Sequence, residues 1–283
     1  MSAVDTGTRT IAVHGGTHLE VLQDGAGEPL VLVCGTSQSQ HLWAPILPPL
    51  TGRYRVTTYD HRGIGGSARG SGELSAASLA EDLNTLLAGL GIARAHVLGW
   101  SLGSVVAQEL AIRHPDRVGS LVLAATWGRT STYQQAVFTA LRHPWRTGDR
   151  AAALTALGIA YSRELLASDA YATMGQQLEP LFPVGEQMAT VVEQWDVDLA
   201  HDARDRLGAV TAPTLVVAGE QDLLTPPEEG RAVAELIPGA RFELLTGPGS
   251  SHAALMERPG DFDEIVLGFL AEHPLPAGRR SAV

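Results

Sequence analysis

Short apolar runs alternate along most of the chain with segments in which apolar residues recur every three or four positions. The run at residues 54–59 predicts a buried strand, and leucines on one face predict an amphipathic helix at residues 78–90. Thr225 and Glu228 predict a capping box at the start of another helix. Such alternation favours a mostly parallel sheet with helices on both faces. The same patterns predict a leading hairpin (10–14 and 18–23), strands at 30–34, 95–99, 119–125, 213–218 and 241–245, and helices at 41–50, 102–114, 225–237 and 262–270.

The strand pattern disappears between residues 127 and 205. Apolar spacing there predicts helices at residues 132–143, 150–161, 168–177 and 185–199, punctuated by prolines. We therefore expect a helical cap at residues 129–205. It is inserted after the sixth strand of an α/β core that comprises residues 1–128 and 206–283.

A serine lies between two glycines where the fifth predicted strand gives way to a helix, in the sequence Gly99-Trp100-Ser101-Leu102-Gly103. A sharp turn from strand to helix brings two backbone segments together, so small residues are needed on both sides of the serine. The turn exposes the hydroxyl of Ser101 at the edge of the sheet. The free N–H of Leu102, at the start of the helix, can stabilise a developing oxyanion. Ser101 is therefore the candidate nucleophile.

Two further strand ends supply the partners that a serine nucleophile needs. The strand at 213–218 runs into Asp222, and the strand at 241–245 runs into His252. A serine hydroxyl is a poor nucleophile until a base removes its proton, and histidine, which titrates near neutral pH, is a suitable base. A carboxylate such as Asp222 fixes the imidazole tautomer and stabilises the imidazolium. The order Ser101, Asp222, His252 along the chain predicts a catalytic triad.

With this order of residues the chain resembles the α/β-hydrolase superfamily outside residues 128–205. Residues 59–67, YDHRGIGGS, are similar to the turn D-x-R-G-x-G-x-S after the family's fourth strand, and residues 33–37 stand where the family has its oxyanion loop. The chain looks most like capped members such as 3-oxoadipate enol-lactonases, antibiotic-pathway methylesterases and cofactor-free perhydrolases. The resemblance implies an α/β-hydrolase fold with an eight-stranded, mostly parallel sheet. It also implies that the N–H of Thr36 is the second oxyanion donor beside that of Leu102.

The chain departs from the family's pattern at two positions. Cys34 stands where the oxyanion loop usually has histidine, and Ser251 stands where glycine usually precedes the catalytic histidine. The oxyanion donor survives the first change because it is a backbone N–H. Cys34 has no base of its own, and we interpret it as a small core residue.

Aromatic residues supply the candidate walls of a substrate pocket. They are few, and most lie in the predicted cap or beside the active-site loops. Because a helical cap also needs a core, we expect most of them to pack and a minority to line a largely apolar pocket. The candidates for substrate binding are Trp43, Trp100, Trp127, Tyr133, Phe138 and Trp195.

Charge and motifs exclude several classes of function. A net charge of −11 argues against nucleic acid or an anionic membrane as a partner, since both require basic patches. The chain has no phosphate-binding P-loop and no dinucleotide-binding glycine motif, so no nucleotide cofactor is implied. It also lacks a signal-peptide pattern and any apolar stretch of ~20 residues. We expect a cytoplasmic protein that acts on a small molecule. The sequence is also compatible with a homodimer.

One acidic cluster near the end of the cap contains potential metal ligands: Asp196, Asp198, His201, Asp202 and Asp205. Carboxylates and imidazole bind metals, but the same residues are common on a solvated helix face and a linker. We favour the solvated face and predict neither a metal nor another cofactor.

The leading hypothesis is hydrolysis of a small, largely apolar carboxylic ester or lactone through an acyl-enzyme. A natural-product thioesterase, acyl transferase or cyclase would use the same pocket. The fold also serves non-catalytic receptors of small molecules, some with an intact triad, so a binding protein is the alternative outside enzymology.

Overall fold

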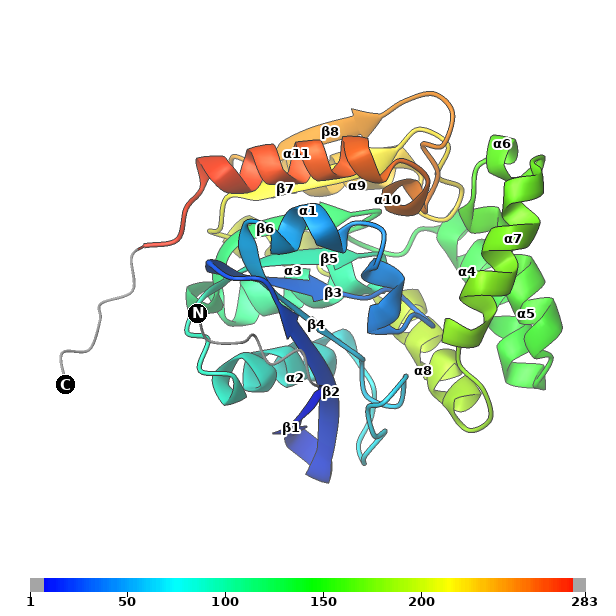
Figure 1. Cartoon of the computed structure of the whole chain (residues 1–283), viewed down its shortest axis with the longest axis horizontal. Helices are drawn as coiled ribbons and strands as arrows, with labels where there is room; N and C mark the ends of the chain where they lie inside the picture. The colour runs from blue at the N-terminus through cyan, green and yellow to red at the C-terminus, as the bar shows by residue number, and fades with distance from the viewer. Residues whose placement is uncertain (1–7, 277–283) are drawn as a thin grey trace.

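An eight-stranded sheet forms the centre of the computed structural model, which describes residues 8–276 (Figure 1). Its strands are β1 (Arg9–Val13), β2 (Thr17–Asp24), β3 (Glu28–Val33), β4 (Tyr54–Tyr59), β5 (Ala95–Trp100), β6 (Val118–Ala124), β7 (Thr214–Gly219) and β8 (Arg241–Leu245). They lie in the order β1-β2-β4-β3-β5-β6-β7-β8. β2 pairs antiparallel with β1 and β4, and all other neighbours are parallel. The mostly parallel sheet confirms the predicted fold class.

Helices cover both faces of the sheet: α1 (Leu47–Thr51) and α11 (Pro259–Glu272) on one, and α2 (Ala76–Gly89), α3 (Leu102–Arg113) and α9 (Pro227–Leu236) on the other (Figure 1). Successive residues of a strand point to opposite faces. Val31 and Val33 of β3 therefore pack with α2 and α3, whereas Leu30 and Leu32 pack with α1 and α11. This two-sided burial explains why the central strands are apolar without interruption.

The register of the parallel strands brings the functional loops together. Val33 at the end of β3 is opposite Gly99 of β5, so the chain segments that follow the two strands leave the sheet side by side. In the same way, Gly219 at the end of β7 is opposite Leu245 at the end of β8. Loops at the carboxyl ends of neighbouring parallel strands form the usual binding edge of such sheets.

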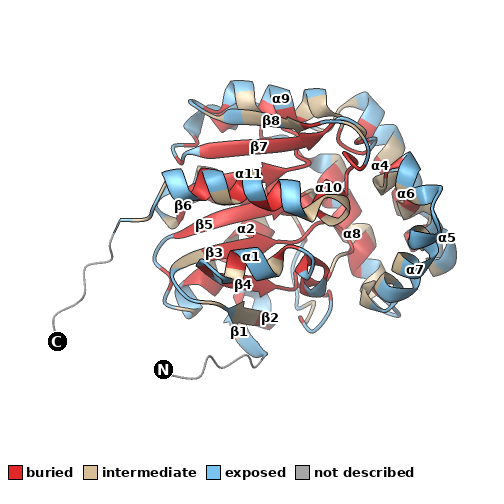
Figure 2. Ribbon diagram, turned by 45° about the horizontal axis from the view of Figure 1, so that its top comes forward, coloured by how far each residue is buried: buried red, intermediate tan, exposed pale blue. Residues whose placement is uncertain are grey.

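The chain between β6 and β7 is helical, as predicted. Its helices, called the cap below, are α4 (Thr132–Thr147), α5 (Arg150–Ala156), α6 (Arg163–Leu166), α7 (Asp169–Leu178) and α8 (Gln187–Ala200). They lie beyond the carboxyl ends of the parallel strands, and Figure 2 shows the outward sides of α5 and α7 exposed. The side chains of Phe138, Trp145 and Trp195 form a core that also takes in Val105 of α3. The domain boundaries at 128/129 and 205/206 stay a prediction.

Three predicted helices differ from the structure. The predicted helix 41–50 is a 3-10 turn at Gln40–Trp43 followed by α1, whose first turn contains two prolines. Helix α4 continues through Pro144 to Thr147, and the predicted helix 150–161 ends its α-helical part at Ala156. Within residues 8–276, no helix is long and apolar enough to cross a bilayer.

Candidate active site

Ser101 lies in a strained turn between β5 and α3. Its φ of 56° is in the left-handed region, which residues with a side chain rarely adopt. A Cβ on Gly99 would lie 2.2 Å from the carbonyl oxygen of Gly103, and a Cβ on Gly103 would lie 1.9 Å from that of Val33. Only glycine fits these positions, and the close packing of the two backbones holds Ser101 at the turn.

His252 and Asp222 form a hydrogen-bonded pair in the loops after β8 and β7. The Nδ1 atom of His252 lies 2.9 Å from Oδ2 and 3.1 Å from Oδ1 of Asp222. The Asp222 side chain is fully buried, and that of His252 is 5% exposed. The loops approach closely because Gly219 has no side chain: a Cβ there would lie 2.2 Å from the carbonyl oxygen of Ser250. His252 is followed by the short helix α10 (Ala254–Glu257).

Several donors hold the carboxylate of Asp222 in place. Its Oδ1 accepts the backbone N–H groups of Leu224 and Thr225, each at 2.8 Å. Its Oδ2 accepts the hydroxyl of Thr225 at 2.6 Å in addition to Nδ1–H of His252. This arrangement fixes the imidazole with Nε2 free to act as a base.

The predicted capping box at Thr225 is wrong. The hydroxyl of Thr225 bonds to Asp222, and the residue that precedes α9 is Pro226.

Ser101 and His252 line the same cavity between the sheet and the cap, with a volume of about 40 Å³. Trp100 supports the pair: its Nε1–H donates to the carbonyl oxygen of His252 at 3.0 Å. Among residues 8–276, the Ser101 hydroxyl makes no hydrogen bond to His252. Bonds between a catalytic serine and histidine often tighten only in the complex with substrate.

The two predicted oxyanion donors flank Ser101. Leu102 is the first residue of α3, so its N–H has no acceptor within the helix. A Cβ on Gly35 would lie 3.1 Å from Cβ of Ser101, and Thr36, the next residue, lines the cavity with Ser101. In the described part of the chain neither Thr36 nor Leu102 has an acceptor for its N–H. Two free N–H groups beside the serine are what stabilisation of an oxyanion requires.

The structure brings two of the six aromatic candidates, Trp100 and Trp195, to the cavity. Trp43 lies beneath Trp100, with 6.0 Å between ring centres, in the core that faces α11. It is fully packed and does not line the cavity.

The other three aromatic candidates lie away from the cavity, in or on the cap. Trp127 and Phe138 pack against each other in the core between the cap and α3. Tyr133 is 48% exposed and donates its hydroxyl to the carbonyl oxygen of Leu223. The core between the cap and α3 therefore takes up Trp127 and Phe138, two of the side chains that were expected in the pocket.

Four cap residues that were not singled out from the sequence as site residues line the cavity: Leu157, Ala160, Tyr161 and Phe182. They lie in the segments after α5, where Leu157–Ala160 form a 3-10 turn, and after α7, where Phe182 follows a second 3-10 turn. Burial raises the pKa of Tyr161 to about 12, so its hydroxyl stays neutral. Aromatic character was the only signal in the sequence for Tyr161 and Phe182, since helical periodicity does not place residues of irregular segments.

The two departures from the family's pattern have local explanations. Cys34 is buried, and burial raises the pKa of its thiol well above the usual range, which keeps the thiol protonated and unreactive. Its carbonyl oxygen accepts Nε2–H of His61 at 3.0 Å, and burial lowers the pKa of His61 to about 4. Ser251 donates its hydroxyl to Oε1 of Glu257 at 2.5 Å, and that oxygen also accepts the N–H of Ser162 in the cap.

The acidic cluster at the end of the cap is only partly solvated. Asp196, Asp202 and Asp205 are exposed, but Asp198 and His201 are buried. The interpretation as a solvated face is therefore wrong for these two residues, because α8 docks with them against the core. Among the described residues, no group of three or more histidines, cysteines or carboxylates is arranged to hold a metal ion.

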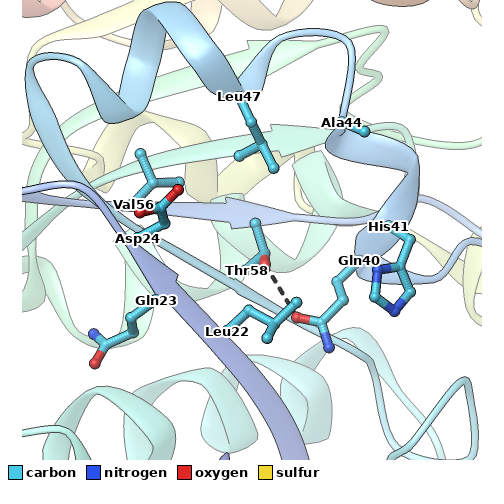
Figure 3. Close-up of a pocket in the computed structure, with 9 residues that line it drawn as sticks. All are labelled: Leu22, Gln23, Asp24, Gln40, His41, Ala44, Leu47, Val56 and Thr58. Carbon is cyan, nitrogen blue, oxygen red and sulfur yellow. Dashed lines mark hydrogen bonds between the residues drawn. The ribbon is translucent and has the colours of Figure 1, made fainter. Parts of the chain in front are cut away.

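A larger cavity, about 230 Å³ in volume, lies beside β2 and β4 and contains none of the triad residues (Figure 3). The side chain of Gln40, at its wall, accepts the hydroxyl of Thr58 at 3.0 Å, as Figure 3 shows. The backbone N–H of Gln40 donates to Asp60 at 2.6 Å. These polar groups satisfy one another and brace the turn after β4.

Known proteins resemble the chain over most of its length. Residues 28–259 match the family described as the alpha/beta hydrolase fold. RutD of Azorhizobium caulinodans, provisionally named a carbamate hydrolase, is 30% identical over 251 residues, which cover 88% of this chain and 93% of RutD. BpoC of Mycobacterium tuberculosis H37Rv, provisionally named a non-heme bromoperoxidase, is 31% identical over 257 residues, which cover 88% of this chain and 95% of BpoC.

Solved structures give the same result. The crystal structure of the enol-lactonase from Burkholderia xenovorans LB400 is similar with a TM-score of 0.84 at 28% sequence identity. The match covers 93% of this chain and 100% of the enol-lactonase chain. These similarities confirm the resemblance that the triad order and the loop motifs indicated. The chain belongs to the α/β-hydrolase fold family.

Proposed function

We propose that the protein is a serine hydrolase that cleaves a small, largely apolar carboxylic ester or lactone through an acyl-enzyme. The observation that carries the proposal is the arrangement around one cavity of Ser101 and His252, with Nδ1 of His252 2.9 Å from Asp222. A serine on a strained turn and a histidine held by a buried carboxylate are the parts that nucleophilic acyl transfer needs.

In the proposed reaction, Oγ of Ser101 attacks the carbonyl carbon while Nε2 of His252 takes the hydroxyl proton. The N–H groups of Thr36 and Leu102 stabilise the negative charge on the carbonyl oxygen. His252 then gives its proton to the leaving oxygen, the bond from that oxygen to the acyl carbon breaks, and the acyl group stays on Ser101. A water molecule, deprotonated by His252, attacks the acyl carbon and releases the acid and the free serine.

The similarities support an acyl carbon as the point of attack. A lactone and a carbamate, which give the enol-lactonase and RutD their names, both present a carbonyl carbon to a nucleophile. Simple esters, lactones, thioesters and a carbamate therefore form the substrate panel for a first test.

The size of the cavity supports a substrate that extends into the cap. A volume of about 40 Å³ holds little more than one water molecule. A groove of about 310 Å³ in the cap, called the cap groove below, shares Leu157, Tyr161 and Phe182 with the walls of the catalytic cavity. Other apolar side chains along the cap groove include Leu154, Met174 and Leu178. We expect an apolar acyl or alcohol part of the substrate to lie in the cap groove.

Ser101→Ala tests the proposal. Turnover of the best substrate in the panel should fall by roughly 10⁴ to 10⁶-fold, because the nucleophile is lost while the fold is kept. His252→Ala should cost about as much, and the double variant should lose little more. A fluorophosphonate should label the wild-type protein at Ser101, as measured by mass spectrometry, and should not label Ser101→Ala.

The same measurements separate the alternatives. Wild-type turnover in Ser101→Ala would exclude acyl-enzyme chemistry at this residue. Labelling of Ser101 without turnover of any substrate in the panel would favour a binding protein. Transfer of the acyl group to an added alcohol or amine, in preference to water, would favour an acyl transferase.

A further inference from the structure

Helix α8 of the cap holds the loop that carries the N–H of Thr36. Gln194 and Asp198 lie one turn apart on α8, and both are buried. Oε1 of Gln194 accepts the backbone N–H of Ser37 at 2.8 Å. Oδ2 of Asp198 accepts the hydroxyl of Thr36 at 2.5 Å. Two adjacent loop residues are therefore bonded to two adjacent turns of one cap helix.

The loop needs such support because its backbone is strained. The N–H of Gln38 donates to the carbonyl oxygen of Gly35 at 3.3 Å, which closes a turn over Thr36 and Ser37. Ser37, the third residue of this turn, has a φ of 64°. Glycine is the usual residue at such a position, since a side chain makes positive φ unfavourable. Bonds from outside the loop therefore oppose relaxation of the turn, which would also rotate the N–H of Thr36.

The polar atoms of Gln194 and Asp198 argue against a role in packing alone. Nε2 of Gln194 and Oδ1 of Asp198 are buried and have no hydrogen-bond partner in the described part of the chain. Methionine or leucine would fill similar volumes without leaving a buried polar atom unpaired, which is costly. Polar side chains at these positions therefore destabilise the interface between cap and core. The interactions that these two polar side chains make are the hydrogen bonds to Thr36 and Ser37.

We propose that Gln194 and Asp198 are positioning residues that hold the N–H of Thr36 in the geometry of the oxyanion hole. The oxyanion hole is then complete only when α8 is seated on the core. Neither residue lines the cavity at Ser101, so both act through the loop. The inference rests on the proposed function, because it gives the loop a role in an acyl-enzyme reaction.

The test compares substitutions that remove the acceptor oxygen with one that keeps it. Asp198→Leu and Gln194→Met roughly keep the side-chain volume and lose the oxygen, and kcat for an ester should fall about 10- to 100-fold with KM within about threefold. Asp198→Asn retains an oxygen acceptor and should stay within about fivefold of the wild-type kcat. The control is Asp196→Leu, the same change at an exposed α8 residue that pairs with Arg142. It should leave both constants unchanged.

A second readout separates a defect in the oxyanion hole from a general packing defect. In a thionoester the charge develops on sulfur, a weaker hydrogen-bond acceptor, so the oxyanion hole contributes less to the reaction. The ratio of ester to thionoester turnover should fall in Asp198→Leu and in Gln194→Met. Ser37→Gly relieves the strain at positive φ, and it should restore a large part of kcat when combined with Gln194→Met. If an apolar variant does not fold, Thr36→Val replaces it in the test. This variant keeps the backbone N–H of residue 36 but loses the hydroxyl that bonds to Asp198, and it should lower the ratio of ester to thionoester turnover.

The outcomes distinguish this inference from the proposed function. An unchanged kcat and ratio in folded Asp198→Leu and Gln194→Met would overturn the inference. Equal losses on ester and thionoester, with no rescue by Ser37→Gly, would overturn it too. Turnover by Ser101→Ala at the wild-type rate would instead overturn the proposed function. If Ser101 is required and labelled but the ratio does not move, only the role assigned to α8 is lost.

Discussion

At the scale of single residues, the contact between α3 and β3 leaves no room for a side chain at position 103. A Cβ on Gly103 would lie 1.9 Å from the carbonyl oxygen of Val33 and 2.7 Å from that of Cys34. Gly103→Ala should push α3 away from β3 and lower the free energy of unfolding by about 2–4 kcal/mol. It should also lower kcat, because Leu102 and Ser101 move with the start of α3.

Gly268→Ala is the matched control for this prediction. Gly268 lies inside α11, and no atom other than its near neighbours lies within 4 Å of a Cβ built on it. Alanine should therefore stabilise the protein by about 0.5–1 kcal/mol, as expected for a helix interior. Urea unfolding of both variants gives the two free energies. Equal values would mean that α3 does not pack closely on β3 at position 103.

The triad could be predicted residue by residue because each member has a local signal. Two glycines flank Ser101 where two backbones meet, and Asp222 and His252 follow apolar strands. Asp198 has no such signal. It stands among acidic residues that are exposed, whereas its own carboxyl group is buried and bonded to Thr36, 162 positions away in the chain. Periodicity within one helix cannot predict which element covers it.

At the scale of elements, the cap is bonded to the loops on both sides of the cavity. On one side, α8 bonds to the oxyanion loop. On the other, Glu257 of α10 accepts the N–H of Ser162 and the hydroxyl of Ser251, and the N–H of Ala253 donates to the carbonyl oxygen of Ala160. The serine that replaces the family's usual glycine before His252 therefore ties the histidine loop to the cap.

The helical nature of the cap could be predicted, but its aromatic side chains could not be divided between core and cavity. Loss of the strand pattern and the spacing of apolar residues indicated helices, and the structure contains them. Trp127 and Phe138 pack in the core between the cap and α3, whereas Phe182, from the segment after α7, reaches the cavity. That division depends on how the helices pack against one another and on the path of the segments between them, which short-range patterns do not encode.

The wall between the catalytic cavity and the cap groove gives a prediction about substrate preference. Phe182 belongs to both linings, so Phe182→Ala should widen the space between the catalytic cavity and the cap groove. The ratio of kcat/KM for an octanoyl ester to that for an acetyl ester should rise about tenfold, because added apolar length finds added space. A series of p-nitrophenyl esters from two to eight carbons measures this ratio. Val184→Ala, a smaller truncation at a 59% exposed position of the same segment, is the control. If the ratio changed equally in both variants, Phe182 would not be a residue that contacts the substrate.

At the scale of the whole molecule, buried ionisable groups make stability depend on pH in opposing directions. Burial lowers the pKa of His61 and of His201 to about 4. Between about pH 4 and 6.5 the unfolded chain binds protons at these histidines and the folded chain does not. The two histidines therefore make the free energy of unfolding rise with pH over this range. Burial raises the pKa of Asp198 to about 7. The unfolded chain releases this proton near pH 4 and the folded chain keeps it, so Asp198 makes the free energy of unfolding fall between about pH 4 and 7.

Asp198→Asn should remove the second of these contributions, since asparagine has no proton to release. The difference in free energy of unfolding, variant minus wild type, should therefore increase from pH 4 to pH 7 by on the order of 2–4 kcal/mol and then level off. Thermal and urea unfolding at constant ionic strength measure this difference, in which the contributions of His61 and His201 cancel because both proteins contain them. Asp196→Asn, on the exposed side of α8, should give a nearly constant difference. A constant difference for Asp198→Asn as well would show that its carboxyl group is charged in the folded protein throughout this range. The oxyanion loop would then have a buried negative charge one hydrogen bond from Thr36, where catalysis requires a positive potential.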